Sequence, residues 1–445
     1  MDSAIEVVEF INKYLWNYIL IFLLCGTGIY FTLKFKFIQV RKFKEAFRKT
    51  FGGISFGKKA GKDGMTSFQA LATSISAQVG TGNLAGAATA IVSGGPGAIF
   101  WMWISAFFGM STIFAEATLA QVYKTEKDGE VTGGPAYYIS KGLNNKFLAG
   151  FFSMSIIIAL GFIGNMVQAN SIGSAFQKAF NISPYIIGII LAVLTALIFI
   201  GGMSRIASFA EKIVPVMAIF YIIGSLFIIL INYECIIPAF KAIFIGAFTP
   251  AAVGGGVLGV TVKEAIRYGV SRGLFSNEAG MGSTPHAHAV AKVKHPCDQG
   301  LVAMMGVFID TFIILTLTAL VILTTGALKG GTTGIELTQQ AFTNGMGGFG
   351  EKFIAISLFF FAFSTIIGWY FFGEANIKYL FGKKSLIIYR ILVMMFVFLG
   401  CGLKVDLVWQ LADLFNGIMV FPNLIALIGL SAIVKKKLDE YEKIK

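Results

Sequence analysis

The sequence predicts an all-α integral membrane protein with about eleven transmembrane helices, and three observations support this fold class. First, 56% of the 445 residues are hydrophobic and only 13% are charged, which leaves too few polar residues to cover a soluble surface. Second, apolar runs close to the roughly 20 residues of one membrane span recur along almost the whole chain. Third, no polar stretch is long enough for a separate soluble domain. We therefore expect a single membrane domain.

The apolar runs define the candidate helices in chain order, with each end placed to within a few residues. They span residues 8–35, 66–92, 97–123, 147–178, 184–202, 209–232, 261–292, 298–326, 351–378, 385–401 and 407–433. Several exceed the length of a minimal span, so we expect these helices to tilt or to extend beyond the bilayer.

Basic residues follow the first apolar run and the last one, and they account for much of the net charge of +13. The clusters are Lys34, Lys36, Arg41, Lys42, Lys44, Arg48, Lys49, Lys58, Lys59 and Lys62, and then Lys435, Lys436 and Lys437. Lysine and arginine beside spans mark the cytoplasmic side of a cell-membrane protein. With an odd number of spans, the N-terminus is expected outside and the C-terminus in the cytoplasm. Because no basic and aromatic platform lies outside the spans, we expect a lipid bilayer and no nucleic acid as partner.

Ten helices remain when the first is set aside, and they form two groups of five. An odd number in each group means that the second group enters the membrane from the opposite side, which is the arrangement of an inverted repeat. The predicted organisation is an N-terminal helix with a basic cytoplasmic linker (1–65), a first repeat (66–232), an extracellular connection (233–260), a second repeat (261–433) and a basic cytoplasmic tail (434–445).

The first helix of each group carries a helix-breaking sequence at a similar depth. Residues 78–83 read Gln-Val-Gly-Thr-Gly-Asn, and residues 276–285 read Ser-Asn-Glu-Ala-Gly-Met-Gly-Ser-Thr-Pro. Glycine weakens a helix by about 1 kcal/mol and proline by about 3 kcal/mol relative to alanine. In hydrocarbon, unwound backbone persists only where it is buried in protein or lines a cavity. Matching breaks in two halves therefore indicate the binding site of a transporter. The alternative is that these glycines only allow close helix packing, but each break also carries amide or carboxylate side chains, which favour a binding site.

The residues at both breaks resemble those of a known family. Residues 78–91, Gln-Val-Gly-Thr-Gly-Asn-Leu-Ala-Gly-Ala-Ala-Thr-Ala-Ile, and residues 273–283, Gly-Leu-Phe-Ser-Asn-Glu-Ala-Gly-Met-Gly-Ser, resemble the first and sixth core helices of the alanine or glycine:cation symporter family. Residues 132–139 and 363–370 also resemble family motifs. The resemblance covers about residues 60–425. It implies the leucine-transporter fold of five-plus-five inverted repeats and sodium-coupled import of alanine, glycine or similar small amino acids.

A zwitterionic amino acid needs partners for both of its charges in a low dielectric. The helical segment after a break offers N–H groups and a positive dipole end, and the segment before it offers carbonyls. We therefore expect the substrate carboxylate near Thr81, Gly82 and Asn83, with Gln78 as an amide donor. The ammonium group is expected at carbonyls around Phe275 and Ser276, beside Asn277.

Apolar and aromatic residues, which also serve in ordinary packing, are expected to form the walls of the predicted site. Phe275, Met281 and Trp369 would restrict the site to small side chains, although Trp369 is equally compatible with a packing or membrane-interface role. Asn165 and Gln168 share one helix face, so one of them is expected to touch the substrate; either could instead join helices.

The resemblance also implies a sodium site between the first broken helix and helix 351–378. Carbonyls near Ser76 and Val79, the carbonyl near Phe361, and the hydroxyls of Ser364 and Thr365 would supply the hard oxygen ligands. The alternative is that both hydroxyls bond only to their own helix. A second ion would use Asn83 and the substrate carboxylate.

Other functions are less well supported by the sequence. Glu278 lies in the second break and could bind a proton, which keeps a proton-coupled carrier open, or could pair with Arg267 or Arg272. His286, His288 and His295 lack acidic or cysteine partners at ligand spacing, so neither a metal site nor an enzyme is expected. An ion channel would explain broken helices but not inverted halves. We expect the protein to act as a monomer, with sodium as the only co-transported ion and no organic cofactor.

Overall fold

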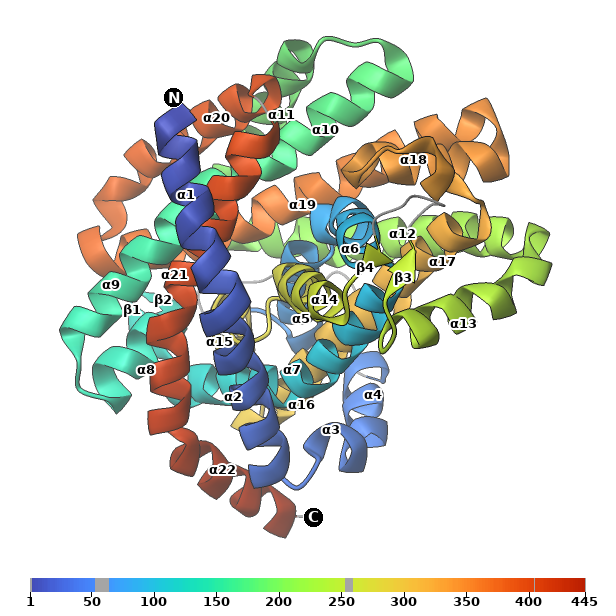
Figure 1. Cartoon of the computed structure of the whole chain (residues 1–445). Coiled ribbons are helices and arrows are strands. Elements are labelled where there is room, and N and C mark those ends of the chain that lie inside the picture. Colours follow the sequence, from blue (N-terminus) through green and yellow to red (C-terminus); the bar gives the residue numbers. More distant parts are fainter. Residues whose placement is uncertain (1, 53–63, 253–258, 404, 445) are drawn as a thin grey trace.

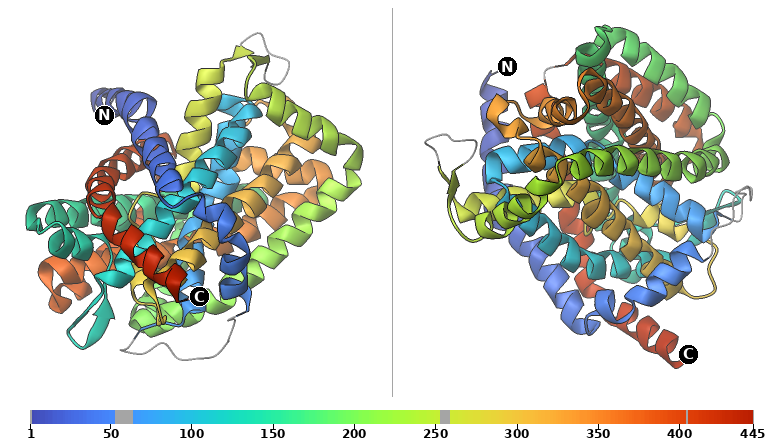
Figure 2. Two further views of the ribbon diagram at one scale, coloured as in Figure 1. Left: turned by 90° about the horizontal axis from the view of Figure 1, so that it is seen from below. Right: turned by 90° about the vertical axis from the view of Figure 1, so that its right-hand side faces the viewer.

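The computed structural model describes residues 2–52, 64–252, 259–403 and 405–444. Figure 1 shows a bundle made almost entirely of helices, with two short two-stranded sheets. The N-terminal and C-terminal ends lie at opposite ends of the molecule in Figure 1 and in the right-hand view of Figure 2. Of the predicted basic cluster, Lys58, Lys59 and Lys62 fall outside the described residues.

The N-terminal segment precedes the two groups of five spans. It consists of α1 (Asp2–Tyr14), the π-helix η1 (Leu15–Ile19), α2 (Leu20–Lys34), α3 (Ile38–Arg41) and α4 (Phe43–Phe51). The continuous rod from α1 to α2 packs against two helices that are distant in sequence. Asn12 donates to the Gln410 carbonyl at 2.8 Å, and the Thr32 and Ser111 hydroxyls are 2.9 Å apart. The additional helix therefore braces α7 and α21 together.

The first group of spans starts with a broken helix and continues through four uninterrupted ones. Its elements are α5 (Ser67–Gln78), η2 (Gly82–Gly86) and α6 (Ala87–Gly94), then α7 (Gly97–Val122), then α9 (Lys146–Ile156), η3 (Ile157–Gly164) and α10 (Asn165–Phe180), then α11 (Pro184–Phe199) and α12 (Gly202–Ile231). The last of these begins earlier than the predicted residue 209. The predicted loop was wrong because only Ile200 and Gly201 separate α11 from α12.

The second group repeats this order. Its elements are α14 (Val262–Asn277) and α15 (Pro285–Ala289), then α16 (Pro296–Val307), η5 (Phe308–Leu315) and α17 (Thr316–Thr324), then α19 (Gly348–Phe381), α20 (Leu386–Gly402) and α21 (Val405–Gly429). The connecting elements are β1 (Thr125–Lys127), β2 (Glu130–Thr132), α8 (Pro135–Gly142), η4 (Tyr233–Cys235), α13 (Ile236–Gly246), β3 (Ala251–Ala252), β4 (Gly259–Val260), η6 (Ala327–Gly330), α18 (Gly334–Met346), η7 (Lys383–Ser385) and α22 (Ser431–Lys443).

The described helices account for about eleven membrane spans. Seven are long and apolar enough to cross a membrane, and Leu20–Lys34 and Pro184–Phe199 are shorter apolar helices. The two broken helices supply the remaining spans. Large apolar side chains such as Val216, Ile219 and Ile223 on α12 are exposed, as expected for a surface that meets lipid.

The two broken helices start in the same way and end at comparable depths. Thr66 caps α5 and Thr261 caps α14, and each side chain accepts the N–H of the third helical residue, Gln69 or Glu264, whose side chain bonds back to the cap. The helix then runs for 12 residues in α5 and 16 in α14 before it stops. Both lie near the centre of the bundle in Figure 1. The helix α5 packs against α12, α19 and α16, whereas α14 packs mainly against α7 and α6. The fold is thus an inverted repeat of five plus five spans, with one additional N-terminal helix.

The hairpin β1–β2 is held against the end of α19 by ion pairs. Lys378 lies 3.0 Å from Glu130 and 2.8 Å from Glu374, and Lys383 lies 3.2 Å from Glu130. Lys127 also donates to the Lys378 carbonyl at 2.9 Å. The loop after α7 is therefore attached to a helix of the other group of spans.

Candidate substrate and sodium site

The two breaks touch each other in the centre of the bundle. A Cβ atom placed on Gly82 would lie 3.0 Å from the Ser276 Cα atom, so the two backbones approach as closely as a glycine allows. The Gln78 amide nitrogen donates to the Asn277 carbonyl at 2.7 Å. This bond uses one of the two N–H donors of the amide that the sequence assigned to the substrate. Gln78 therefore joins the two breaks in this structure.

The first break redirects the N–H groups that follow α5. In a continuous helix the N–H of Gly80 would bond to the Ser76 carbonyl. Here it donates to the Asn83 side-chain oxygen at 3.0 Å, and the Thr81 N–H donates to the Gln168 side-chain oxygen at 3.2 Å. The Thr81 hydroxyl is buried and has no hydrogen-bond partner among the described residues. The break therefore presents both a freed carbonyl and an unused hydroxyl.

The second break frees two carbonyls in the same manner. The N–H of Ala279 donates to the Asn277 side chain at 3.1 Å instead of to the Phe275 carbonyl. The N–H of Gly280 donates to the Glu116 carboxylate at 3.0 Å instead of to the Ser276 carbonyl. The carbonyls expected to bind the substrate ammonium group are thus released from the helix.

Five oxygen-bearing groups predicted to bind sodium lie together between the first break and α19. The Thr365 hydroxyl is 2.9 Å from the Ser76 carbonyl, 3.5 Å from the Val79 carbonyl and 3.0 Å from the Phe361 carbonyl. The Ser364 hydroxyl is 2.9 Å from the Phe361 carbonyl and 3.4 Å from the Ser76 carbonyl. Both hydroxyls therefore bond to their own helix and also reach across to the first break.

A buried carboxylate, which the sequence did not place at the site, lies between the two breaks. Asp310 accepts from the Asn83 amide at 2.7 Å, from the Ser276 hydroxyl at 2.9 Å and from the Thr311 hydroxyl at 2.8 Å. All of these donors are neutral, and Asp310 has no ion pair among the described residues. The available signal was an Asp-Thr pair inside an otherwise apolar run.

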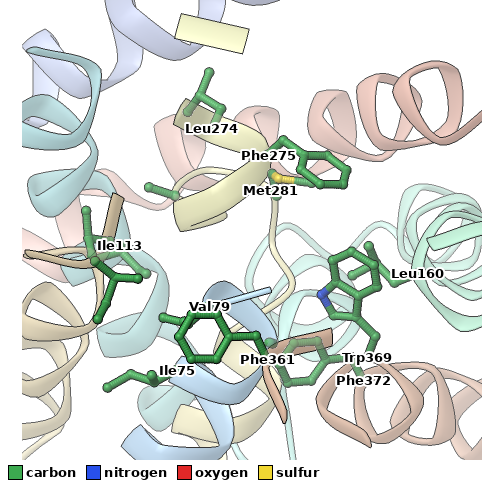
Figure 3. Close-up of a cluster of buried hydrophobic side chains, with 14 of the residues drawn as sticks. Ile75, Val79, Ile113, Leu160, Leu274, Phe275, Met281, Phe361, Trp369 and Phe372 are labelled. Atoms are coloured by element: carbon green, nitrogen blue, oxygen red, sulfur yellow. The ribbon is translucent and has the colours of Figure 1, made fainter. Parts of the chain in front are cut away.

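The predicted apolar wall forms one buried cluster, shown in Figure 3. Phe275 and Met281 come from the second break and Trp369 from α19, and the Phe275 and Trp369 rings meet edge to face at 6.1 Å. Trp369 is only 2% exposed, and its indole N–H donates to Glu278 at 2.5 Å. The membrane-interface alternative for Trp369 is therefore wrong.

The two amides of the third span have different partners. Gln168 bonds to the first break through Thr81, whereas Asn165 donates to the Gly161 carbonyl of its own helix at 3.0 Å. Gln168 therefore contacts the first break, and its role in binding substrate stays a prediction.

The proposed ion pair between Glu278 and an arginine is not formed. Arg272 instead makes a two-bond pair with Asp413, at 2.9 and 2.8 Å. Glu278 bonds to Trp369 and, at 2.5 Å, to the Ser283 hydroxyl. The histidines His286 and His288 are buried rather than open to solvent, and the described residues contain no metal-type group of His, Cys, Asp and Glu side chains.

The comparison with known proteins identifies the family. The profile of the sodium:alanine symporter family matches residues 1–445. The chain belongs to the sodium:alanine symporter family. Its relatives include the sodium/alanine symporter AgcS of Methanococcus maripaludis, with 42% identity over 99% of this chain and 98% of the relative. The probable sodium/glutamine symporter GlnT of Bacillus subtilis is 44% identical over 100% of this chain and 92% of the relative. A third relative, also from Bacillus subtilis, is the putative sodium/proton-dependent alanine carrier protein YrbD, with 42% identity over 98% of this chain and 92% of the relative.

Solved structures support the fold. This chain superposes on MhsT in complex with L-phenylalanine with a TM-score of 0.60 at 12% identity, covering 86% of this chain and 98% of MhsT. The manganese transporter of Eremococcus coleocola gives a TM-score of 0.55 at 13% identity, covering 81% and 75% of the two chains. The predicted leucine-transporter-like fold is therefore confirmed. The protein is a multi-pass membrane protein of a sodium-coupled amino-acid symporter family and is not an enzyme.

Proposed function

We propose that this symporter imports small neutral amino acids, alanine and glycine, together with sodium, by alternating access of the central site to the two sides of the membrane. The observation that carries the proposal is the contact between two broken helices, each of which releases backbone groups at the same place. Carbonyls and N–H groups freed in this way bind a zwitterion without charged side chains. Two buried polar atoms that have no hydrogen-bond partner in the described part of the chain, the Thr81 hydroxyl oxygen and the Gln78 amide oxygen, support a ligand at the first break.

The substrate is oriented by the opposite polarity of the two breaks. Its carboxylate faces Thr81, Gly82 and Asn83, near the start of the helical segment that continues the first span. Its ammonium group faces the freed carbonyls of Phe275 and Ser276. In the transport cycle, the Gln78 amide exchanges its bond to the Asn277 carbonyl for the substrate carboxylate.

The side chain of the substrate points toward the apolar cluster of Phe275, Met281 and Trp369. The hydrogen bond between the Trp369 indole and Glu278 fixes the plane of the indole ring, so the wall resists a larger substrate. GlnT, a relative at 44% identity, is named for glutamine. The rigid wall favours alanine and glycine over glutamine in this chain.

Two cations bind on either side of the substrate. The first binds the carbonyls of Ser76, Val79 and Phe361 and the hydroxyls of Ser364 and Thr365 and holds α19 to the first break. The second binds near Asn83 and the substrate carboxylate, where the Asp310 carboxylate supplies a negative charge without a basic partner among the described residues. A buried unpaired carboxylate is costly, and a bound cation offsets that cost.

The orientation follows from the distribution of basic residues, and the domain boundaries follow from the two groups of five spans. The N-terminus lies outside the cell and the C-terminus in the cytoplasm, with the ends of α2 and α22 at the positive cytoplasmic face. Residues 66–232 and 261–433 form the two repeats, with segments 1–65, 233–260 and 434–445 around them. Each chain contains both breaks, so a monomer is sufficient for transport.

Equilibrium binding tests the proposal directly. Purified protein should bind alanine and glycine in sodium and not in choline, and it should bind glutamine and leucine at least tenfold more weakly.

Proton coupling is the competing function, because Glu278 and Asp310 are buried carboxylates that have no ion pair among the described residues. Alanine binding that ignores sodium and follows pH would favour that alternative and contradict the sodium assignment.

A further inference from the structure

Glu116 on α7 is a buried carboxylate that the proposed sites for substrate and sodium do not use. One carboxylate oxygen accepts the N–H of Gly280 at 3.0 Å, and the other accepts the N–H of Gly282 at 2.9 Å. The second oxygen also accepts from the Asn423 amide at 2.7 Å. Glu116 is 0% exposed and has no ion pair among the described residues. Every group facing its carboxylate in this network is therefore an N–H donor.

The backbone of the second break is shaped to deliver these two N–H groups. Gly280 and Gly282 have φ angles of +88° and +80°, a region that side chains other than glycine rarely adopt. A Cβ atom on Gly280 would lie 2.8 Å from Leu24, and one on Gly282 would lie 2.8 Å from Phe152. The two glycines thus provide both the conformation and the space for the bonds to Glu116.

The bond to Gly280 has a direct effect on the site. It engages the Gly280 N–H, which in a continuous helix would donate to the Ser276 carbonyl. We propose that Glu116 is a positioning residue that holds the second break open, so that this carbonyl remains free for the ammonium group of the substrate. The inference rests on the proposed function, because it assumes that the ammonium group binds at the second break.

The same carboxylate connects the break to two further elements. Asn423 on α21 donates to Glu116 and, at 2.9 Å, to the Gly280 carbonyl. Its side-chain oxygen accepts the Tyr138 hydroxyl of α8. A change in the break is therefore coupled to α21 and α8 through one amide side chain.

Replacement of Glu116 by glutamine tests the role at nearly constant size. An amide has one acceptor oxygen, and its NH2 group would face one of the two glycine N–H groups. Losing a hydrogen bond to a charged group is expected to weaken alanine binding by about ten- to a hundredfold. Sodium binding in the absence of alanine should stay within about twofold of wild type, because the hydrogen bonds of Glu116 to described residues go to Gly280, Gly282 and Asn423 and not to the proposed sodium ligands. Glu374→Gln, a buried carboxylate paired with Lys378, is the matched control and should bind alanine as wild type does.

The outcomes separate this inference from the function on which it rests. Wild-type protein that binds no alanine would contradict the proposed function. If the wild-type protein and E116Q bind alanine equally well, the positioning role of Glu116 is refuted and the proposed function is not. Parallel loss of alanine and sodium binding would show a merely structural role and also refute it. If E116Q does not fold, Asn423→Ala is the second test, because it removes one hydrogen-bond donor to Glu116 and keeps the Glu116 carboxylate. Alanine affinity should then fall about threefold. Unchanged alanine affinity would overturn the inference.

Discussion

Replacement of Thr365 by valine probes the sodium site with almost no change in side-chain volume. The Thr365 hydroxyl is fully buried and lies within 3.5 Å of three carbonyl oxygens, those of Ser76, Val79 and Phe361. Valine removes this hydroxyl and places a methyl group against the Ser76 carbonyl. Sodium would lose one of five proposed ligands.

The expected loss of sodium affinity follows from the free energy of one hydrogen-bond-like contact to a charged group, which is about 1.5–3 kcal/mol when the site is buried. The sodium concentration that gives half-maximal alanine binding should therefore rise roughly ten- to a hundredfold. Thr365→Ser keeps the hydroxyl and should stay within about threefold of wild type. Thr195→Val is the control for a general effect, because the buried Thr195 hydroxyl bonds only to the Ala192 carbonyl of its own helix, at 2.9 Å.

The assay is alanine binding to purified protein at increasing sodium with constant ionic strength. A shift in T365V that is absent from T195V and largely rescued in T365S would support the ligand assignment. If the sodium concentration for half-saturation of T365V lies within about twofold of the wild-type value, the Thr365 hydroxyl is not a sodium ligand. The sodium site would then lie elsewhere.

Three further results are expected. Gly82→Ala should weaken alanine binding at least tenfold, because the added Cβ atom would press on Ser276. The control Gly86→Ala should bind alanine normally, because no atom lies closer than 4.0 Å to its added Cβ. Equal alanine affinities of the two variants would show that the breaks need not touch. Asp310→Asn should lower the Hill coefficient of sodium in alanine uptake, and an unchanged coefficient would remove the second cation. Glu130→Gln should speed amide exchange across residues 125–132, because Glu130 loses its ion pair with Lys378; unaltered exchange would mean that the ion pairs do not hold the hairpin.

Local sequence signals were sufficient to predict the membrane-spanning helices of this fold, apart from the start of α12, whereas the connecting helices α8, α13 and α18 were not predicted. Each membrane span must be apolar where it meets lipid, so apolar runs in the sequence identify the spans. Glycines at residues 80 and 82 inside one such run indicate a helix break, even when the residues that pack against it are unknown. The adjacent hydroxyls of Ser364 and Thr365 stand out in the same way within an apolar run. The structure brings them to the first break, and their role in binding sodium stays a prediction.

Features that depend on partners distant in sequence could not be predicted in this way. Asp310 was recognisable as a carboxylate within a span, but its bonds to Asn83 and Ser276 require three separate spans to meet. Arg272 was expected near Glu278 because they are close in sequence, yet it pairs with Asp413, 141 residues away. Short-range reasoning fails there because the break turns Glu278 toward α19.

Uptake into sealed proteoliposomes tests the central claim, sodium-driven import of a small amino acid. Purified protein is reconstituted, and alanine accumulation is followed under an inward sodium gradient without a pH gradient, and then under a pH gradient without sodium. The account predicts accumulation above equilibrium only in the first condition. Accumulation driven by the pH gradient alone, or alanine entry that never exceeds equilibrium under the sodium gradient, would contradict it.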